Sequence, residues 1–245
     1  MNVDLKLDAL GAGRPVLVLH GGGGPATVAG LAAHLAEHAQ VMAPAHPGWD
    51  GTPRPESISS IGDLAMLYLR SLKDHGLRDV MVVGSSMGAW IALEMAVRDT
   101  GGIIGKVVVI DGVGVVAPGE TVVDFFSLTP RGVAEHAYHE PDKFFVDPAS
   151  LPPERQAIMR GNMAALRAVA GTEMADPKLL GRLAKVDAPT LVLWGESDRI
   201  ATPSYGRALA AALPNGQFQL IERAGHLPQL ERPAETFAAL DRFLG

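Results

Sequence analysis

Cysteine is absent from the 245-residue sequence, which excludes disulfide bonds, thiolate nucleophiles and zinc sites built from cysteine. The formal net charge is -6, and no run of lysine and arginine could neutralise a phosphate backbone, so a nucleic-acid partner is not expected. Long apolar runs are missing too, because none approaches the roughly 20 residues that a membrane helix needs. Residues 1–6 lack the apolar centre of a secretory signal. We therefore expect a cytoplasmic protein with a small-molecule substrate and without a nucleic-acid or membrane partner.

Short apolar runs alternate with longer amphipathic segments, which is the pattern of a parallel sheet covered by helices on both faces. The expected strands are Pro15–Leu19, Gln40–Ala43, Val80–Val83, Lys106–Ile110, Thr190–Trp194 and Gln217–Ile221. The expected helices lie near Thr27–Glu37, Ser59–His75, Met87–Arg98, Ser204–Leu213 and Ala234–Leu244. We predict the α/β class, with a mostly parallel central sheet of about seven to eight strands and helices on both faces.

The alternation stops in residues 112–186, where apolar runs of the strand type disappear. Helix starts such as Thr129-Pro130 and Asp176-Pro177 appear there instead. We interpret residues 112–186 as a helical cap, or lid, inserted into a single α/β core made of residues 1–111 and 187–245.

Aromatic side chains are few, at 5% of the residues, and they are unevenly spread. Four of the seven phenylalanines lie in the expected cap: Phe125, Phe126, Phe144 and Phe145. This concentration favours an apolar lid over the sheet, and internal packing of the rings in an ordinary helical subdomain is left open as the alternative. Charges of both signs are scattered over the same segment, so we infer no strongly anionic substrate.

The pentapeptide Gly84-Ser85-Ser86-Met87-Gly88 follows the apolar run Val80–Val83 and precedes a helix-forming segment. It has the pattern G-x-S-x-G in a strand–turn–helix context. Such a turn holds its central residue in a strained conformation above the sheet, so small residues are needed two positions before and after it. The N-terminus of the next helix favours negative charge that develops nearby. We predict Ser86 as a nucleophile and a structural role for Ser85.

A glycine run follows the first expected parallel strand, in His20-Gly21-Gly22-Gly23-Gly24-Pro25. Glycines let a loop bring backbone N–H groups close to an oxyanion, where each donor is worth on the order of 3 kcal/mol. The run contains neither G-x-x-x-x-G-K-[ST] nor G-x-G-x-x-G, which disfavours a phosphate-binding loop. Together with the serine pattern, it resembles the α/β-hydrolase superfamily, in which the residue after His-Gly and the residue after the nucleophile donate to the oxyanion. The resemblance implies Gly22 and Met87 as donors, with Gly23 as an alternative, and the ring of His20 is expected to be structural.

Two later strands lead to a candidate acid and a candidate base. Thr190–Trp194 precedes an acidic turn that contains Asp198, and Gln217–Ile221 precedes a loop that contains His226. The carboxyl ends of strands in an open α/β sheet meet at one edge, so we expect Ser86, Asp198 and His226 to converge. The histidine would accept the serine proton, and the carboxylate would fix the histidine tautomer.

Glu196 and Asp111 compete with Asp198 for the position of the acid. Glu196 is the nearest in sequence, and some members of the superfamily place the acid after the strand that here ends before Asp111. For Asp111 we favour a structural role. The patterns G-x-x-D-x-I around Asp198 and A-G-H-x-P-x-x-E-x-P around His226 strengthen the resemblance, as does the chain order serine, aspartate, histidine.

The resemblance covers nearly the whole chain and includes the loop His46–Pro55, in which Trp49 is either a pocket wall or a structural ring. The chain departs from many relatives at its N-terminus, where the residues before Pro15 leave room for one antiparallel strand instead of a hairpin. This leaves a sheet of seven strands open, beside one of eight. A serine at the turn argues against dehalogenase and epoxide-hydrolase chemistry, which uses an aspartate nucleophile in this superfamily.

The resemblance implies a serine hydrolase that cleaves a small, mainly apolar carboxylic ester or related acyl bond through an acyl-enzyme on Ser86. A second hypothesis uses the same triad for carbon–carbon bond hydrolysis, cyanohydrin cleavage as a lyase, or cofactor-free peroxidase chemistry. A third is a ligand-sensing receptor of this fold with little turnover. No cofactor and no metal are expected, and pairing into a homodimer through the lid or the N-terminal sheet edge is left open.

Overall fold

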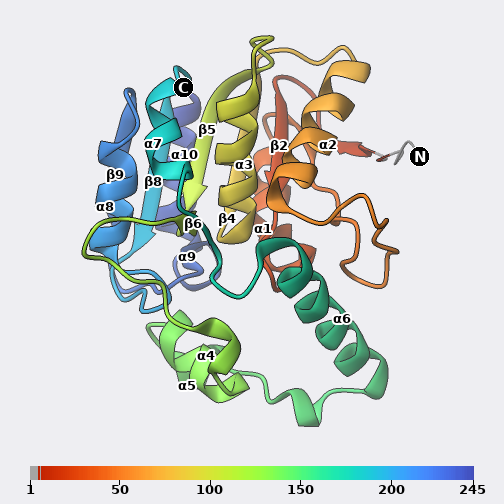
Figure 1. Cartoon of the computed structure of the whole chain (residues 1–245), viewed down its shortest axis with the longest axis vertical. Coiled ribbons are helices and arrows are strands. Elements are labelled where there is room, and N and C mark those ends of the chain that lie inside the picture. Colours follow the sequence, from red (N-terminus) through yellow and green to blue (C-terminus); the bar gives the residue numbers. More distant parts are fainter. Residues whose placement is uncertain (1–4, 6) are drawn as a thin grey trace.

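In the computed structural model, which describes residue 5 and residues 7–245, seven strands form the central sheet (Figure 1). These strands are β1 (Ala9–Leu10), β2 (Pro15–Leu19), β3 (Gln40–Met42), β4 (Val80–Ser85), β5 (Ile104–Ile110), β8 (Thr190–Gly195) and β9 (Gly216–Ile221). Their order is β1-β3-β2-β4-β5-β8-β9, and only β1 runs antiparallel to its neighbour in this described part of the chain. The predicted α/β class and the single antiparallel strand before Pro15 are thus confirmed. Apart from Leu5, the prediction about a secretory signal in residues 1–6 lies outside the described residues.

The central strands are buried on both faces, and their side chains alternate between two hydrophobic clusters. In β4, Val80 and Val82 belong to one cluster, whereas Met81 and Val83 belong to the other. The same division holds for β5, where Val107 faces the first cluster and Val108 the second. Successive strand residues point to opposite faces, so a continuous apolar run is what a sheet covered on both sides requires.

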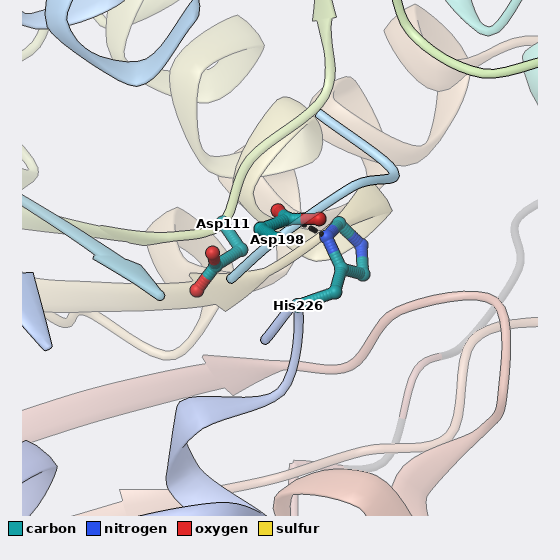
Figure 2. Close-up of side chains that lie close together, drawn as sticks. All are labelled: Asp111, Asp198 and His226. Carbon is teal, nitrogen blue, oxygen red and sulfur yellow. Dashed lines mark hydrogen bonds and ion pairs between the residues drawn. The ribbon is translucent and has the colours of Figure 1, made fainter. Parts of the chain in front are cut away.

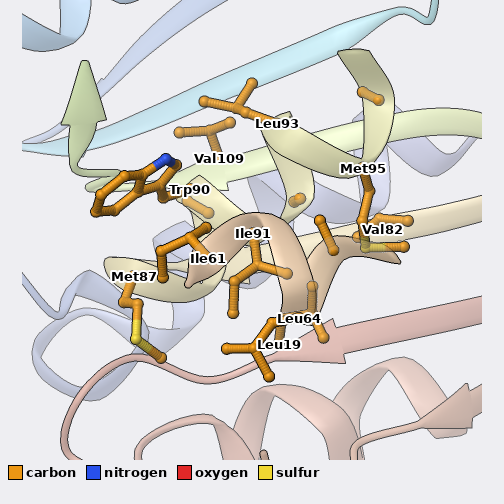
Figure 3. Close-up of a cluster of buried hydrophobic side chains, with 14 of the residues drawn as sticks. Leu19, Ile61, Leu64, Val82, Met87, Trp90, Ile91, Leu93, Met95 and Val109 are labelled. Carbon is orange, nitrogen blue, oxygen red and sulfur yellow. The ribbon is translucent and has the colours of Figure 1, made fainter. Parts of the chain in front are cut away.

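Helices cover the two faces of the sheet. They are α1 (Ala29–Ala36), α2 (Ile61–Asp74), α3 (Met87–Arg98), α8 (Pro203–Ala211), α9 (Pro228–Glu231) and α10 (Pro233–Leu244), with the 3-10 helix η1 (Pro25–Val28) before α1. Helices α2, α3 and α8 pack in the first cluster, part of which is drawn in Figure 3, and α1 and α10 pack in the second. Within the described residues, no helix combines the length and the apolar character needed to cross a membrane.

The strand order places a switch point beside β2. After β2 the chain passes through α1 to β3 on one side, and it then returns through α2 to β4 on the other side. In open α/β sheets, ligands bind at the carboxyl ends of the strands at such a point. The glycine run follows β2 and the G-x-S-x-G turn follows β4, so the topology brings these two loops together.

Residues 112–186 contain the helices that lie beyond the ends of the strands, as Figure 1 shows for α4, α5 and α6. The elements of this segment are β6 (Gly114–Val115), η2 (Phe125–Ser127), α4 (Pro130–Ala137), α5 (Pro141–Phe144), η3 (Pro148–Ser150), α6 (Pro153–Ala170), β7 (Ala175–Asp176), α7 (Leu179–Arg182) and η4 (Leu183–Lys185). We propose that this segment is a cap on a core formed by residues 1–111 and 187–245. In its last part, η4 packs on α3 of the core, whereas α7 contacts β6 of the same segment.

Two local expectations for the cap need correction. The segment contains two short strands, β6 and β7, which pair with each other as a separate two-stranded sheet and are too short to give a periodic pattern. The helix expected from Asp176-Pro177 begins at Leu179, because the carboxylate of Asp176 accepts a hydrogen bond from the N–H of Lys178 and holds a turn there. The start at Thr129-Pro130 is correct, since the Thr129 hydroxyl caps α4 by accepting from the N–H of Gly132.

Candidate active site

Ser86 lies between the end of β4 and the start of α3, with a φ of 54° and a ψ of -118°. This is a strained conformation for a residue with a side chain. Glycines flank it because the backbone approaches closely: a Cβ on Gly84 would lie 2.3 Å from the carbonyl oxygen of Gly88, and one on Gly88 would lie 2.1 Å from that of Leu19. The predicted strand–turn–helix geometry is therefore present, and it presents the Ser86 hydroxyl at the N-terminus of α3.

The three residues expected to converge are joined by two hydrogen bonds. The hydroxyl of Ser86 lies 2.9 Å from Nε2 of His226, and Nδ1 of His226 lies 2.8 Å from Oδ2 of Asp198 (Figure 2 draws the second bond). Because an ionised carboxylate can only accept, Nδ1 carries the proton and Nε2 is free to accept from the serine hydroxyl. The other oxygen of Asp198 accepts from the N–H groups of Ile200, at 2.8 Å, and Ala201, at 3.2 Å. These bonds fix the carboxylate that faces the histidine.

Asp111 is the neighbouring buried carboxyl, and it does not contact the histidine through a hydrogen bond. Its Oδ1 accepts from the N–H of Gly195 at 2.8 Å, and its Oδ2 has no partner among the described residues. Burial raises the pKa of the Asp111 carboxyl well above its usual range, and repulsion by the nearby Asp198 raises it further. A neutral Asp111 is consistent with these surroundings, and Figure 2 shows its side chain beside Asp198, on the side away from His226.

Glu196 is also separated from the histidine. Its Oε2 accepts from the N–H of Arg223 at 3.0 Å, and its side chain lies on the exposed side of the turn. Of the three carboxylates considered from the sequence, the structure thus pairs Asp198 with His226.

A metal ion could in principle be held by Asp111, Asp198 and His226, because each offers a ligand atom and these atoms lie within 4.8 Å of one another. Both ring nitrogens of His226 are already hydrogen-bonded, one to Asp198 and one to Ser86. A metal on this histidine would have to replace one of these bonds. The donor set therefore fits a proton relay better than a metal site.

The glycine loop after β2 lies directly against Ser86. A Cβ on Gly21 would be 3.0 Å from the Cβ of Ser86, so no larger residue fits there without movement. The carbonyl of Gly21 accepts from Nδ1 of His20 at 2.7 Å, which fixes the peptide plane that carries the N–H of Gly22. The N–H groups of Gly22 and Gly23 have no backbone acceptor among the described residues. Both therefore stay candidate oxyanion donors, together with the N–H of Met87 at the start of α3.

A buried aromatic cluster supports this loop. His46 donates its backbone N–H to Nε2 of His20 at 3.0 Å, and its own ring bonds the hydroxyl of Tyr68 and the carbonyl of His20. Burial lowers the pKa of His20 to about 4, and burial together with His20 lowers the pKa of His46 well below its usual value. Both rings are thus neutral at pH 7. His20 has the structural role expected from the sequence, whereas the roles of His46 and Tyr68 carried no sequence signal.

Trp49 belongs to the same support and is fully buried. Its Nε1 donates to the carbonyl of Gly22 at 3.0 Å, so the ring stands behind the glycine loop as a structural group. Ser85 is also structural, as expected: it is buried and accepts from Nε2 of Gln229 at 3.1 Å.

The cap contains a cavity of about 520 Å³ with mainly apolar walls. Its lining includes all four phenylalanines that the sequence pointed to, and the complete set is Phe125, Phe126, Leu128, Pro130, Val133, Ala134, Tyr138, Phe144, Phe145, Val146, Pro148, Met159, Met163 and Arg167. The walls belong to η2, α4, α5, α6 and the segments between them. Two helices of the cap contact the loops of the candidate site. Leu166 of α6 lies 2.8 Å from where a Cβ on Gly22 would be. The carbonyl of Ala137 in α4 accepts from the N–H of His226 at 2.6 Å.

Comparisons with known proteins agree with this geometry. A family model described as "Alpha/beta hydrolase family" matches residues 16–240. Among curated proteins, 2-hydroxy-6-oxononadienedioate/2-hydroxy-6-oxononatrienedioate hydrolase 2 of Pseudomonas putida is 28% identical, over 98% of this chain and 91% of that protein. The corresponding hydrolase of Cupriavidus pinatubonensis is 26% identical, over 96% of this chain and 88% of its own length.

Solved structures show the same fold at lower identity. A thermophilic esterase from Thermogutta terrifontis superposes with a TM-score of 0.77 at 23% identity, covering 98% of this chain and 92% of that one. A meta-cleavage product hydrolase from Pseudomonas fluorescens superposes with a TM-score of 0.78 at 19% identity, covering 97% and 92%. At these identities the likeness concerns the fold and not the substrate.

Proposed function

Because the chain belongs to the alpha/beta hydrolase family, we propose that it is a serine hydrolase with Ser86 as nucleophile, His226 as general base and Asp198 as the carboxylate that orients the histidine. The observation that carries the proposal is the unbroken pair of hydrogen bonds from Asp198 through His226 to the hydroxyl of Ser86. It supplies a nucleophile, a base within reach and a group that fixes the tautomer of the base.

The reaction follows from this arrangement in two halves. His226 accepts the proton of Ser86 as Oγ forms a bond to the carbonyl carbon of the substrate, and the carbonyl oxygen becomes an oxyanion next to the N–H groups of Gly22 and Met87. His226 then gives the proton to the leaving alcohol, which departs and leaves an acyl group on Ser86. Water repeats the sequence with His226 as base, so the acid is released and the hydroxyl is restored.

The cap cavity supports an apolar acyl group as the substrate. Its walls carry one charged side chain, that of Arg167. This guanidinium lies 4.6 Å from the ring centre of Phe126 and also borders a second hollow that it shares with Asp124 and Glu173. We propose a small, mainly apolar carboxylic ester or a related acyl compound as the substrate class.

A series of p-nitrophenyl esters from acetate to long chains tests this proposal. We expect turnover with a preference for uncharged acyl chains, and we expect Ser86→Ala to abolish it. Absence of turnover on every ester, or a preference for acyl groups that carry a carboxylate, would contradict the proposed substrate class.

Carbon–carbon bond hydrolysis is the second candidate, and the curated relatives favour it. Their names state that they hydrolyse 2-hydroxy-6-oxononadienedioate, a ketone with two carboxylates. The same triad can attack a ketone carbon. A cavity lined by a single cationic side chain is poorly suited to two carboxylates, however, so the dienedioate is an informative substrate to compare with the esters. Its turnover at a higher kcat/KM than any ester would make this candidate the better one.

A further inference from the structure

We propose that Glu231 is a positioning residue, whose carboxylate locks a segment of the cap against the loop that carries His226 and so keeps the histidine aligned between Ser86 and Asp198. This inference rests on the proposed role of His226 as the base. It gives a function to the glutamate of the A-G-H-x-P-x-x-E-x-P pattern, which the catalytic scheme leaves unused.

The carboxylate of Glu231 is buried and bridges two segments of backbone. One oxygen accepts from the N–H of Gly225 at 2.5 Å, next to His226. The other accepts from the N–H groups of His139, at 2.9 Å, and Glu140, at 3.2 Å, which follow α4 in the cap. Hydrogen bonds from N–H groups to an ionised carboxylate are among the stronger ones in proteins. One side chain thus holds the histidine loop and the cap in a fixed relation.

The two segments are also in direct backbone contact. The N–H of His226 donates to the carbonyl of Ala137 at 2.6 Å. A Cβ on Gly225 would lie 2.2 Å from this carbonyl oxygen and 2.8 Å from the Cα of Tyr138, so the glycine of the pattern is needed for this close approach. A shift of the cap segment would therefore move the backbone of His226 itself.

The loop of Asp198 is attached to the same part of the cap. The N–H of Arg199 donates to the carbonyl of His136 at 3.0 Å, and the guanidinium of Arg199 donates to the carbonyl of Tyr138 at 3.3 Å. A further bond of 2.7 Å joins Nδ1 of His139 to the hydroxyl of Ser197. The loops of His226 and Asp198 are thus both hydrogen-bonded to residues 136–140, and Glu231 supplies a buried carboxyl group at this junction.

The short helix α9 explains the spacing of the pattern. Pro228 starts the helix, and its single turn brings Glu231 back toward Gly225, which lies six residues earlier in the chain. Proline favours the first position of a helix because its missing N–H has no helical partner to lose. The sequence pattern therefore encodes a turn that returns a carboxylate to the backbone beside the histidine.

The variant Glu231→Gln tests the proposal, with Glu235→Gln as the matched control. Glu235 lies four residues later, is exposed and pairs with Arg232. The amide of a glutamine keeps one acceptor oxygen but presents a donor to one of the backbone N–H groups. We expect kcat on the best ester to fall by about 10- to 100-fold in Glu231→Gln, because small displacements of a catalytic group cost this much, with KM changed less. Glu231→Asp, which keeps the charge but shortens the reach, should fall in between.

A second readout separates this inference from the proposed function. The Nδ1 proton of His226, which the bond to Asp198 protects, is followed by NMR through its exchange with water. We expect faster exchange in Glu231→Gln and unchanged exchange in Glu235→Gln, in wild-type-like folded protein and whether or not esters are substrates. A wild type that turns over no substrate would refute the proposed function alone. Equal kcat and equal proton exchange in Glu231→Gln and Glu235→Gln would overturn the positioning role.

Discussion

The core around Ser86 and the cap differ in how far their apolar side chains are exposed to solvent. In the core, side chains such as Met95 of α3 are fully buried. In the cap, Met159 and Met163 of α6 are 44% and 39% exposed, and Val146 is 59% exposed, although all three line the cavity. Apolar side chains in the core stabilise the fold, whereas those in the cap leave apolar surface exposed, as the proposed binding of an apolar substrate requires.

The polar groups show the same contrast. Asp198 and His226 of the proposed site are buried, Ser86 is partly buried, and all three are held by specific hydrogen bonds, as charge that develops during the proposed reaction would require. The cap contributes backbone contacts at residues 136–140 and apolar walls. We therefore expect changes in the core to separate cleanly into those that remove activity and those that remove stability, and changes in the cap to alter substrate preference.

Ser86→Ala should give the largest effect. We expect kcat/KM to fall by about 10⁵-fold, in line with losses of a triad nucleophile elsewhere. The thermal unfolding midpoint should stay close to that of the wild type, because the substitution removes one oxygen and relieves no packing. Steady-state kinetics and a melting curve on the same sample check both parts. Residual activity within tenfold of the wild type would mean that another group is the nucleophile.

The two buried carboxyls give the next largest effect. Asp198→Asn should lower kcat by about 10⁴-fold, because the amide would hold the wrong tautomer of His226. Asp111→Asn should stay within a few-fold of the wild type, since we expect Asp111 to be neutral already. Kinetics of both variants at pH 7 to 8 provide the measurement, and a reversed order of the two losses would assign the acid to Asp111.

Asp111→Asn should also change how the free energy of unfolding depends on pH. The pKa of Asp111 is raised in the folded protein, so the folded state binds a proton that the unfolded state releases above its ordinary pKa. The stabilising contribution of this group is thus lost as the pH rises. Relative to the wild type, Asp111→Asn should become more stable from about pH 4 upward, as urea unfolding at several pH values would show.

Matched methionine substitutions compare the two regions directly. Met95→Ala should lower the free energy of unfolding by about 2 to 5 kcal/mol, because it leaves a cavity in a fully packed core. Met163→Ala should lower it by less than about 1 kcal/mol, because its side chain is partly in water already. The cap variant should instead lower kcat/KM for long-chain esters more than for acetate. Equal loss of stability in both variants, with unchanged chain-length preference, would contradict the contrast between core and cap.

Acid should destabilise the core through His20. Its pKa is about 4 in the folded protein because of burial, against an ordinary value of 6.5, so the unfolded state binds more protons between these values. Stability from the neutral ring is complete above pH 6.5 and is lost as the pH falls toward 4, by on the order of 3 kcal/mol. Urea unfolding of the wild type and His20→Asn should therefore give curves of stability against pH with different slopes. Parallel curves would show that protonation of His20 does not cause the loss of stability in acid.

The sequence predicted most closely the elements that border the glycine run and the strained turn at Ser86. β2 and α3 have the bounds that the apolar runs indicated, and Ser86, Asp198 and His226 could be named because each follows the end of a strand. This works because parallel strands bring their carboxyl ends to one edge, whatever lies between them in the sequence.

The rest depends on contacts that no local pattern records. Helix α6 (Pro153–Ala170) has few buried positions, and they lie in its second half, so its apolar periodicity is weak. The bond from Trp49 to Gly22 and the bridge from Glu231 to the cap join residues whose proximity is set by the fold. The sequence also could not show which residues line the cavity, because elements as short as η2 and α5 have no periodic pattern from which the direction of a side chain can be predicted.

Labelling with a fluorophosphonate tests the central claim most directly, because the reagent bonds only to a serine that has been made nucleophilic. The adduct is located by peptide mass spectrometry in the folded wild type, in Ser86→Ala and in His226→Ala. We expect one adduct, on Ser86, that is absent from the first variant and forms far more slowly in the second. A folded wild type without an adduct, an adduct on another serine, or a rate that does not depend on His226 would contradict the account.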